Sequence, residues 1–235
     1  MTTGAPMAKT TRRRTTPSRW AAAERHLRRV DPHLKTIIDR VGPCLLEPRP
    51  DRFGTLVRAI IGQQISSKAA ASIHRRLVEV GGEPHHPARL IELGEPVLRG
   101  VGLSGVKARY VLNLSEAVAS GNVPLDAIDD SWTDEAIIKS LVSIKGVGVW
   151  TAEMFLIFAL NRPDVLPSGD LGVRAGLRDR YALAELPRPG ECPPLAEIWR
   201  PFRSIASWYL WRGADTRLGQ GPVIAAEKVD STSSR

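Results

Sequence analysis

The chain has 235 residues, which is long enough to bury a substantial core in one domain or in two small ones. Hydrophobic residues make up 43% and charged residues 25%, as in ordinary globular proteins, and no apolar run approaches the roughly 20 residues that span a bilayer. The formal net charge of +8 favours polyanionic partners, with nucleic acid first and an anionic membrane surface second.

The first 19 residues contain five basic side chains among Thr, Ser and Pro, with almost no apolar residues, so they predict a disordered basic arm. This arm has no apolar segment that could serve as a secretory signal or membrane anchor. Cys44 and Cys192 lie too far apart in the sequence to suggest a disulfide framework. We therefore expect a cytoplasmic protein, associated with the nucleoid if the source is bacterial. The arm is either a solubilising tail or a non-specific phosphate contact, and its composition leaves both open.

From Trp20 onward, apolar residues recur every three or four positions, and no alternating strand pattern is convincing. His85 and His86 fall between two such segments and are expected on a surface loop. The sequence thus predicts an all-α protein with a helical domain over 20–214 and a flexible C-terminal tail over 215–235. The expected helices are 20–30, 33–42, 53–64, 66–82, 87–94, 106–121, 133–144, 150–160, 171–183 and 195–214.

The stretch 143–152, SIKGVGVWTA, joins two of the expected helices. Its linker is too short for anything but a tight turn, and Gly146 and Gly148 are expected to permit dihedrals and a close backbone approach that a side chain would block. A helix-hairpin-helix is therefore predicted over 133–160. Backbone N–H groups at the start of the second helix, where the dipole is positive, could bind a phosphate. In isolation, the two glycines would more simply indicate close packing of two helices. A similar stretch, LRGVGLSGVKARYVLNL, lacks the tryptophan and is given less weight.

Twenty residues after Trp150, the segment LPSGDLGVR places Asp170 directly before a helical run. Taken alone, Asp170 is best interpreted as a helix N-cap, which contributes about 1 kcal/mol. The spacing, however, also brings one carboxylate near the far end of the helix that carries Trp150. A carboxylate and an indole are therefore expected to converge on one cleft.

The stretches LVSIKGVGVWTAEMFLIFAL and LPSGDLGVR resemble the helix-hairpin-helix (HhH-GPD) superfamily of base-excision DNA glycosylases. FGTLVRAIIGQQISSKAAASIHRRL and WRPFRSIASWYLWRG resemble helices of its alkylation-repair branch, DNA-3-methyladenine glycosylase II. The resemblance covers roughly residues 35–213 and implies two helical subdomains with the active-site cleft between them. It implies a monofunctional enzyme that hydrolyses the N-glycosidic bond of alkylated bases of the 3-methyladenine type in double-stranded DNA, leaving an abasic site.

By this resemblance, Asp170 is the catalytic carboxylate, and Trp150, Trp211 and Met154 form the base pocket. An alkylated base carries a positive charge that indole faces attract. The carboxylate either stabilises the oxocarbenium character of the sugar or activates the attacking water. Met154 stands where the best-known members have an aromatic residue, and Gly169 where some have a second acid, which leaves the range of substrates open.

The resemblance also implies that Gln64 fills the gap left by an extruded base. Trp150 occupies the position of the Schiff-base lysine of bifunctional members, so strand cleavage is not expected. Two distant cysteines exclude an iron-sulfur cluster of the usual kind, and we expect no required cofactor and a monomer. The implied DNA-contacting residues are Gln63, Gln64, Lys145, Gly146, Val147, Gly148 and Thr151, and the backbone carbonyls of Val142, Ile144 and Val147 are implied to hold Na⁺ or K⁺. The competing hypothesis is a non-catalytic helix-hairpin-helix DNA-binding protein in which Asp170 only caps a helix.

Overall fold

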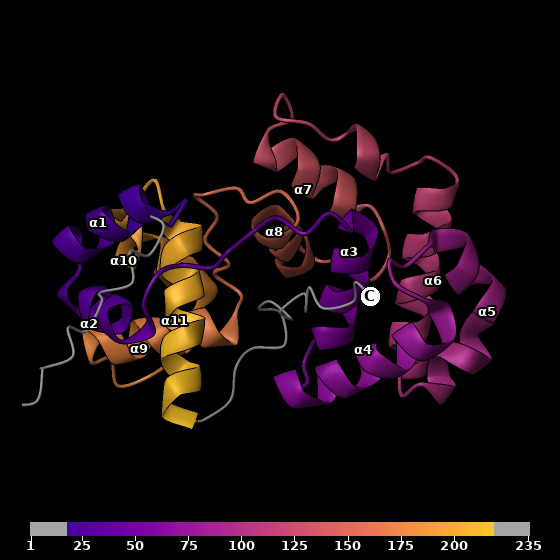
Figure 1. The fold of residues 1–235 in the computed structure, drawn as a ribbon, viewed down its shortest axis with the longest axis horizontal. Helices are drawn as coiled ribbons and strands as arrows, with labels where there is room; N and C mark the ends of the chain where they lie inside the picture. The colour runs from indigo at the N-terminus through magenta and orange to yellow at the C-terminus, as the bar shows by residue number, and fades with distance from the viewer. Residues whose placement is uncertain (1–17, 219–235) are drawn as a thin grey trace, which may run out of the picture.

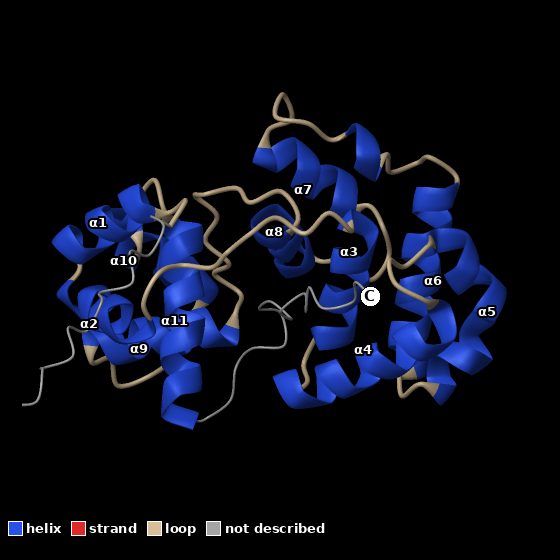
Figure 2. Ribbon diagram, in the orientation of Figure 1, coloured by secondary structure: helices blue, strands red, loops and turns tan. Residues whose placement is uncertain are grey.

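The computed structural model describes residues 18–218, and the side chains of residues 18–214. Nearly all of the expected basic arm, and the tail after residue 218, lie outside the described residues. Within 18–218 the chain forms eleven α-helices and three short 3₁₀-helices without a strand (Figures 1 and 2). The α-helices are α1 (Ala21–Val30), α2 (Pro32–Val41), α3 (Arg52–Gly62), α4 (Ser67–Gly81), α5 (Pro87–Gly100), α6 (Gly105–Ala119), α7 (Asp134–Val142), α8 (Val149–Phe158), α9 (Leu171–Tyr181), α10 (Cys192–Leu195) and α11 (Arg203–Leu218).

The helices divide into two lobes (Figure 1). In the first lobe, α1 and α2 from the start of the chain pack with α9, α10 and α11 from its end. In the second lobe, α3 is central and packs against α4, α6 and α8, while α5 and α7 cover α6 and α8. Two helical subdomains were expected, and the structure confirms them. None of the described helices is both long and apolar enough to cross a membrane.

Polar side chains directly before three of the helices act as N-caps. The hydroxyls of Ser66, Ser104 and Thr133 accept hydrogen bonds from the backbone N–H groups three residues later, at 3.2–3.3 Å. The expected helix 87–94 was too short, because α5 continues past a kink at Gly94 (φ 68°) to Gly100. The expected single helix 195–214 was wrong: the chain turns at Pro201, and α11 begins only at Arg203 and runs to Leu218.

The two glycine-containing stretches form the same turn twice. Gly102 (φ 104°) and Gly146 (φ 105°) have nearly the same positive φ, and each lies two residues before the extended residue that precedes a helix. The similarity suggested by the sequence is therefore real at the level of the backbone. The turns differ in one respect, because Ser104 caps α6 with its side chain whereas Gly148 leaves the start of α8 without a side-chain cap.

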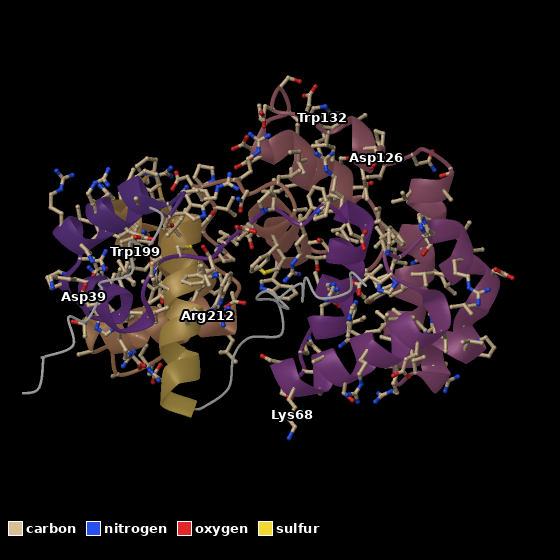
Figure 3. The ribbon with its side chains drawn as sticks, viewed as in Figure 1. Asp39, Lys68, Asp126, Trp132, Trp199 and Arg212 are labelled. Carbon is tan, nitrogen blue, oxygen red and sulfur yellow. The ribbon has the colours of Figure 1, made fainter. Side chains whose placement is uncertain are left out.

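A buried carboxylate organises the first lobe. Asp31 is 0% exposed, and one of its oxygens caps α2 through the N–H groups of His33 and Leu34, both at 3.0 Å. Its other oxygen accepts the indole N–H of Trp199 at 2.6 Å and pairs with the Arg180 guanidinium at 2.5 Å. Trp199 is 0% exposed and lies inside this lobe (Figure 3). Asp31 thus joins the N-terminal helices to α9 and to the segment before α11.

Replacing Asp31 with asparagine should lower the free energy of unfolding by about 3 to 5 kcal/mol, because it leaves the Arg180 charge buried without its partner. Urea unfolding measures this change. Asp39→Asn is the matched control: its carboxylate pairs with Arg28 and Lys35 on the surface, and little change is expected there. Equal effects of the two substitutions would contradict this role of Asp31.

Candidate active site

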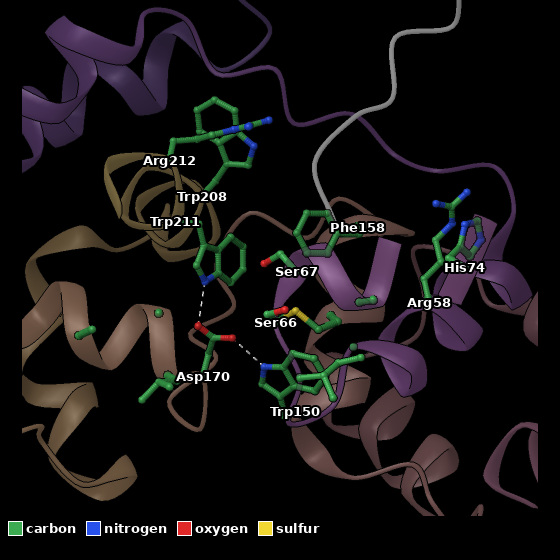
Figure 4. Close-up of a pocket in the computed structure, with 17 residues that line it drawn as sticks. Arg58, Ser66, Ser67, His74, Trp150, Phe158, Asp170, Trp208, Trp211 and Arg212 are labelled. Atoms are coloured by element: carbon green, nitrogen blue, oxygen red, sulfur yellow. Dashed lines mark hydrogen bonds between the residues drawn. The ribbon is translucent and has the colours of Figure 1, made fainter. Parts of the chain in front are cut away.

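A cavity of about 470 Å³ lies between the two lobes (Figure 4). Residues of α3, α4 and α8 line it from the second lobe, and residues of α9 and α11 line it from the first. All four residues assigned from the sequence to catalysis or to the base pocket border this one cavity: Trp150, Met154, Asp170 and Trp211. The structure therefore brings together positions that are up to 61 residues apart in the chain.

The carboxylate of Asp170 accepts three N–H groups. Oδ2 accepts the indole N–H of Trp150 at 2.9 Å, and Oδ1 accepts the indole N–H of Trp211 at 2.8 Å (Figure 4). Oδ1 also accepts the backbone N–H of Val173 at 2.9 Å, which makes Asp170 the N-cap of α9. Asp170 is thus both the N-cap of a helix and a carboxylate at the cleft, so the structure combines the two interpretations that the sequence allowed.

Gly172 makes room for this arrangement. A Cβ atom at this position would lie 2.8 Å from Cδ1 of the Trp211 indole and 3.1 Å from Oδ1 of Asp170. A side chain here would therefore push the indole away from the carboxylate. Gly172 was given no role from the sequence, and nothing in its local sequence indicates that α11 packs over it.

Two further aromatic residues border the cavity. Phe158 stacks on Trp211 with ring centroids 5.6 Å apart and an interplanar angle of 24°, a contact between the two lobes. Phe158 was missed although it lies one turn beyond Met154, which itself lies one turn beyond Trp150. Trp208 is only 4% exposed and also lines the cavity.

The cavity lining also includes polar and basic side chains. Ser66 and Ser67 contribute from the start of α4, and Arg58 and Arg212 contribute from α3 and α11 (Figure 4). The Arg212 guanidinium lies over the Trp208 ring, 5.2 Å from its centroid. None of these four residues was identified from the sequence, because only the packing of the helices brings them to the cleft.

Titratable groups near the cavity are shifted towards their neutral forms. Burial, with a contribution from the Asp170 charge, raises the pKa of Glu153 on α8 to about 8. Burial and the nearby Arg58 lower the pKa of His74 to about 3. His74 lines the cavity, and its Nε2 lies 3.2 Å from Nε2 of His85, whose pKa is also lowered by burial. His85, expected on a surface loop, is only 3% exposed because its loop folds onto α4.

The hairpin between α7 and α8 has one sterically required glycine. At Gly146, a Cβ would lie 2.1 Å from the Tyr110 ring, and φ is 105°, so both packing and backbone exclude a side chain. The expectation that Gly148 is needed for the same reason was wrong, because its φ is −94° and a Cβ there would meet nothing within 4 Å. Gly148 instead leaves open space in front of the first N–H groups of α8, which have no partner within the helix. Lys145 lies exposed beside this turn.

The end of α3 lies against this hairpin. The Gln63 amide donates to the Gly146 carbonyl and to the Thr151 hydroxyl, both at 3.1 Å. The side chains of Gln63 and Thr151 are thus engaged within the protein, and Thr151 is 1% exposed, which leaves its backbone N–H as the group that could meet DNA. Gln64 follows with φ 55° and an exposed side chain.

The three carbonyls expected to hold a cation belong to the end of α7 and to the turn between α7 and α8. Val142 is the last residue of α7, so its carbonyl belongs to a helix end that lacks intrahelical partners. The Ile144 carbonyl accepts the Val147 N–H at 3.0 Å and keeps a second lone pair. Neutral carbonyl oxygens in such a turn suit a weakly held monovalent cation, so these three residues fit Na⁺ or K⁺.

A family model described as HhH-GPD superfamily base excision DNA repair protein matches residues 57–201. DNA-3-methyladenine glycosylase 1 of Schizosaccharomyces pombe is 35% identical over 195 residues, which cover 81% of this chain and 86% of that protein. DNA-3-methyladenine glycosylase 2 of Escherichia coli is 30% identical over 176 residues, covering 68% of this chain and 57% of that protein.

Solved structures are similar along most of the chain. The S. pombe 3-methyladenine DNA glycosylase Mag1, in complex with abasic DNA, aligns with a TM-score of 0.75 and 33% identity, covering 83% of this chain and 97% of the other. A DNA-3-methyladenine glycosidase from Bacillus halodurans aligns with a TM-score of 0.64 and 32% identity, covering 85% and 91%. With its helical hairpin, its cleft carboxylate and these matches, the chain belongs to the HhH-GPD superfamily of base excision DNA repair proteins.

Proposed function

We propose that this protein is a monofunctional DNA glycosylase that hydrolyses the N-glycosidic bond of alkylated bases of the 3-methyladenine type and leaves an abasic site. The observation that carries the proposal is the Asp170 carboxylate, held between two indoles at the edge of a cavity. A carboxylate that only capped α9 would need neither indole, so this arrangement disfavours a purely DNA-binding role. The names of the relatives support the same activity.

The cavity suits a base that has been rotated out of the duplex. Its volume of about 470 Å³ is typical of small-molecule sites, and its lining is aromatic on both sides of the cleft. A purine alkylated on a ring nitrogen is positively charged, and an indole face attracts such a cation by roughly 0.5 to 2 kcal/mol. A normal, neutral base gains no such attraction, so the cavity selects by charge.

The hydrogen bonds of Asp170 indicate how it acts. Both carboxylate oxygens already accept N–H groups, which fix the group in place and favour electrostatic stabilisation over proton abstraction. As the glycosidic bond breaks, the base takes the bonding electrons and leaves as a neutral molecule, because its positive charge was present beforehand. The sugar becomes cationic and is stabilised by the nearby carboxylate. Water then adds its oxygen to C1′ and releases a proton to solvent.

The remaining surfaces would hold the DNA. The uncapped N-terminus of α8, next to Lys145, would bind a backbone phosphate. Gln64 would enter the gap left by the extruded base, and Na⁺ or K⁺ on the carbonyls of Val142, Ile144 and Val147 would add positive charge to the hairpin. No other cofactor is required by this chemistry. We propose that the protein acts as a monomer in the cytoplasm or on the nucleoid.

Asp170→Asn should reduce the release of 3-methyladenine from methylated DNA by roughly 100-fold or more, because the transition state loses its countercharge. Asparagine is also a good N-cap, so α9 should still form. Chromatography of released bases measures activity, and a gel-shift with abasic-site DNA should show nearly unchanged affinity.

Asp179→Asn removes one charge from the exposed side of the same helix and serves as the matched control. Its activity should equal that of the parent protein. Normal base release by the Asp170→Asn protein would remove the proposed mechanism.

Gly148→Ser should lower the affinity for duplex DNA roughly two- to tenfold without loss of stability. Serine fits sterically, and its hydroxyl would cap α8 as Ser104 caps α6, occupying the N–H groups that bind phosphate. Fluorescence anisotropy with undamaged DNA measures affinity. Gly190→Ser, at another glycine with open surroundings, is the control. Unchanged affinity of the Gly148→Ser protein would exclude a phosphate at this helix.

Glu153 should make the stability of the protein fall as pH rises from about 4.5 to about 8. Its pKa is raised on folding, so within this window the folded protein holds a proton that the unfolded chain has lost, and stability decreases with pH. Glu153→Gln removes the titration. The difference in free energy of unfolding between parent and variant should therefore decline from pH 5 to pH 8.5, and parallel curves would contradict the assignment.

A further inference from the structure

Lys107 holds the end of α3 although it lies on another helix. It is the third residue of α6, and its ammonium group donates to the Ile61 carbonyl at 2.8 Å and to the Gln63 carbonyl at 2.6 Å. Both acceptors belong to the C-terminal end of α3, where carbonyl groups lack intrahelical partners and a positive charge is favourable. Burial lowers the pKa of Lys107, as expected for an ammonium placed against backbone instead of water.

The residue that Lys107 holds is itself tied to the hairpin. Gln63 accepts from Lys107 with its backbone carbonyl, while its side-chain amide donates to the Gly146 carbonyl and to the Thr151 hydroxyl. One residue therefore links α6, the end of α3 and the turn between α7 and α8. We call these contacts of Lys107 and Gln63 the α3 clamp.

Directly after the clamp, the chain enters an unusual conformation. Gln64 has φ 55°, one of three non-glycine residues with positive φ among the described residues, and its side chain is exposed. Ile65 is 38% exposed despite being apolar, and Ile65, Ser66 and Ser67 line the cavity. The clamp thus fixes the backbone at one end of a segment whose other end borders the cavity. A free chain of this sequence would seldom hold Gln64 in a left-handed conformation.

We infer that Lys107 is a positioning residue for base extrusion: through the Gln63 carbonyl it presets the turn that presents Gln64 to the DNA. This inference rests on the proposed glycosylase function. Lys107 itself is not among the residues that line the cavity, so it would affect the step in which Gln64 replaces the base in the duplex and would leave the bond cleavage at Asp170 unchanged. A preset turn lowers the conformational entropy lost when Gln64 is ordered in the DNA.

The test compares a base that is paired in the duplex with one that has no partner and leaves no gap when it is extruded. Two duplexes carry a single 7-methylguanine, either paired with cytosine or placed in a one-nucleotide bulge, and single-turnover release is measured for both. Lys107→Met keeps most of the side-chain length but removes the charge, and it should slow release from the paired site by roughly tenfold or more while changing the bulged site less than about twofold. Lys107→Arg, which keeps a donor at this helix end, should restore part of the rate.

Lys35→Met is the matched control, since it removes one positive charge from the surface of α2 in the first lobe. A purely structural role of Lys107 would reduce both rates together with the melting temperature, so the ratio of paired to bulged rates is the decisive measurement. Gln64→Ala should give the same ratio of paired to bulged release rates as Lys107→Met. The double variant Lys107→Met with Gln64→Ala should be no slower than the slower single variant, because both changes affect one step.

An unchanged ratio in Lys107→Met, or multiplicative losses in the double variant, would overturn the inference. Failure of the proposed function gives a different result, since the parent protein would then release neither 7-methylguanine from the two duplexes nor 3-methyladenine from methylated DNA. If the parent protein and the Lys107→Met variant release 7-methylguanine from both duplexes at the same rates, the role of Lys107 is excluded while the proposed function stands.

Discussion

The cleft depends on one carboxylate that binds groups from both lobes. Asp170 accepts the Trp150 indole from α8 of the second lobe and the Trp211 indole from α11 of the first, and it also caps its own helix. The two bonds from the indoles orient Trp150 and Trp211 as well as the carboxylate. The three hydrogen bonds of Asp170 therefore position its negative charge and orient the two indoles at the cavity. They also join the two lobes. Gly172 is part of this arrangement, because a side chain there would separate Trp211 from Asp170.

The surfaces that would meet DNA are joined to each other by equally specific contacts. The hairpin is closed by Gly146 against Tyr110, and the Gln63 amide connects it to the end of α3. A phosphate bound at the start of α8 and a side chain inserted at Gln64 would consequently be held at a fixed separation. Such rigidity suits an enzyme that must distort its substrate, because the energy of phosphate binding can then be used to extrude a base.

Sequence patterns were sufficient to predict the features that depend on residues close together in the chain. Helical spacing indicated the all-α fold, the glycine turn indicated the hairpin, and a resemblance over residues 35–213 brought Asp170, Trp150 and Trp211 to one cleft. Phe158 could also have been found, since it continues the face of Trp150 and Met154. Gly172, Trp208, His85 and Lys107 could not, because their positions follow from the packing of helices that are distant in sequence. The conformational need for Gly148 was inferred wrongly for a related reason: a turn sequence does not show which glycine meets a neighbouring side chain.

The central claim is that a nucleotide leaves the duplex and places its sugar beside Asp170. The most direct measurement is a crystal structure of the protein bound to duplex DNA that contains one tetrahydrofuran abasic-site analogue. The account predicts the analogue's sugar ring in the cavity facing the Asp170 carboxylate, with Gln64 in the gap of the duplex and a phosphate at the N-terminus of α8. An analogue that remains within the helical stack, with the cavity facing intact duplex, would contradict the account.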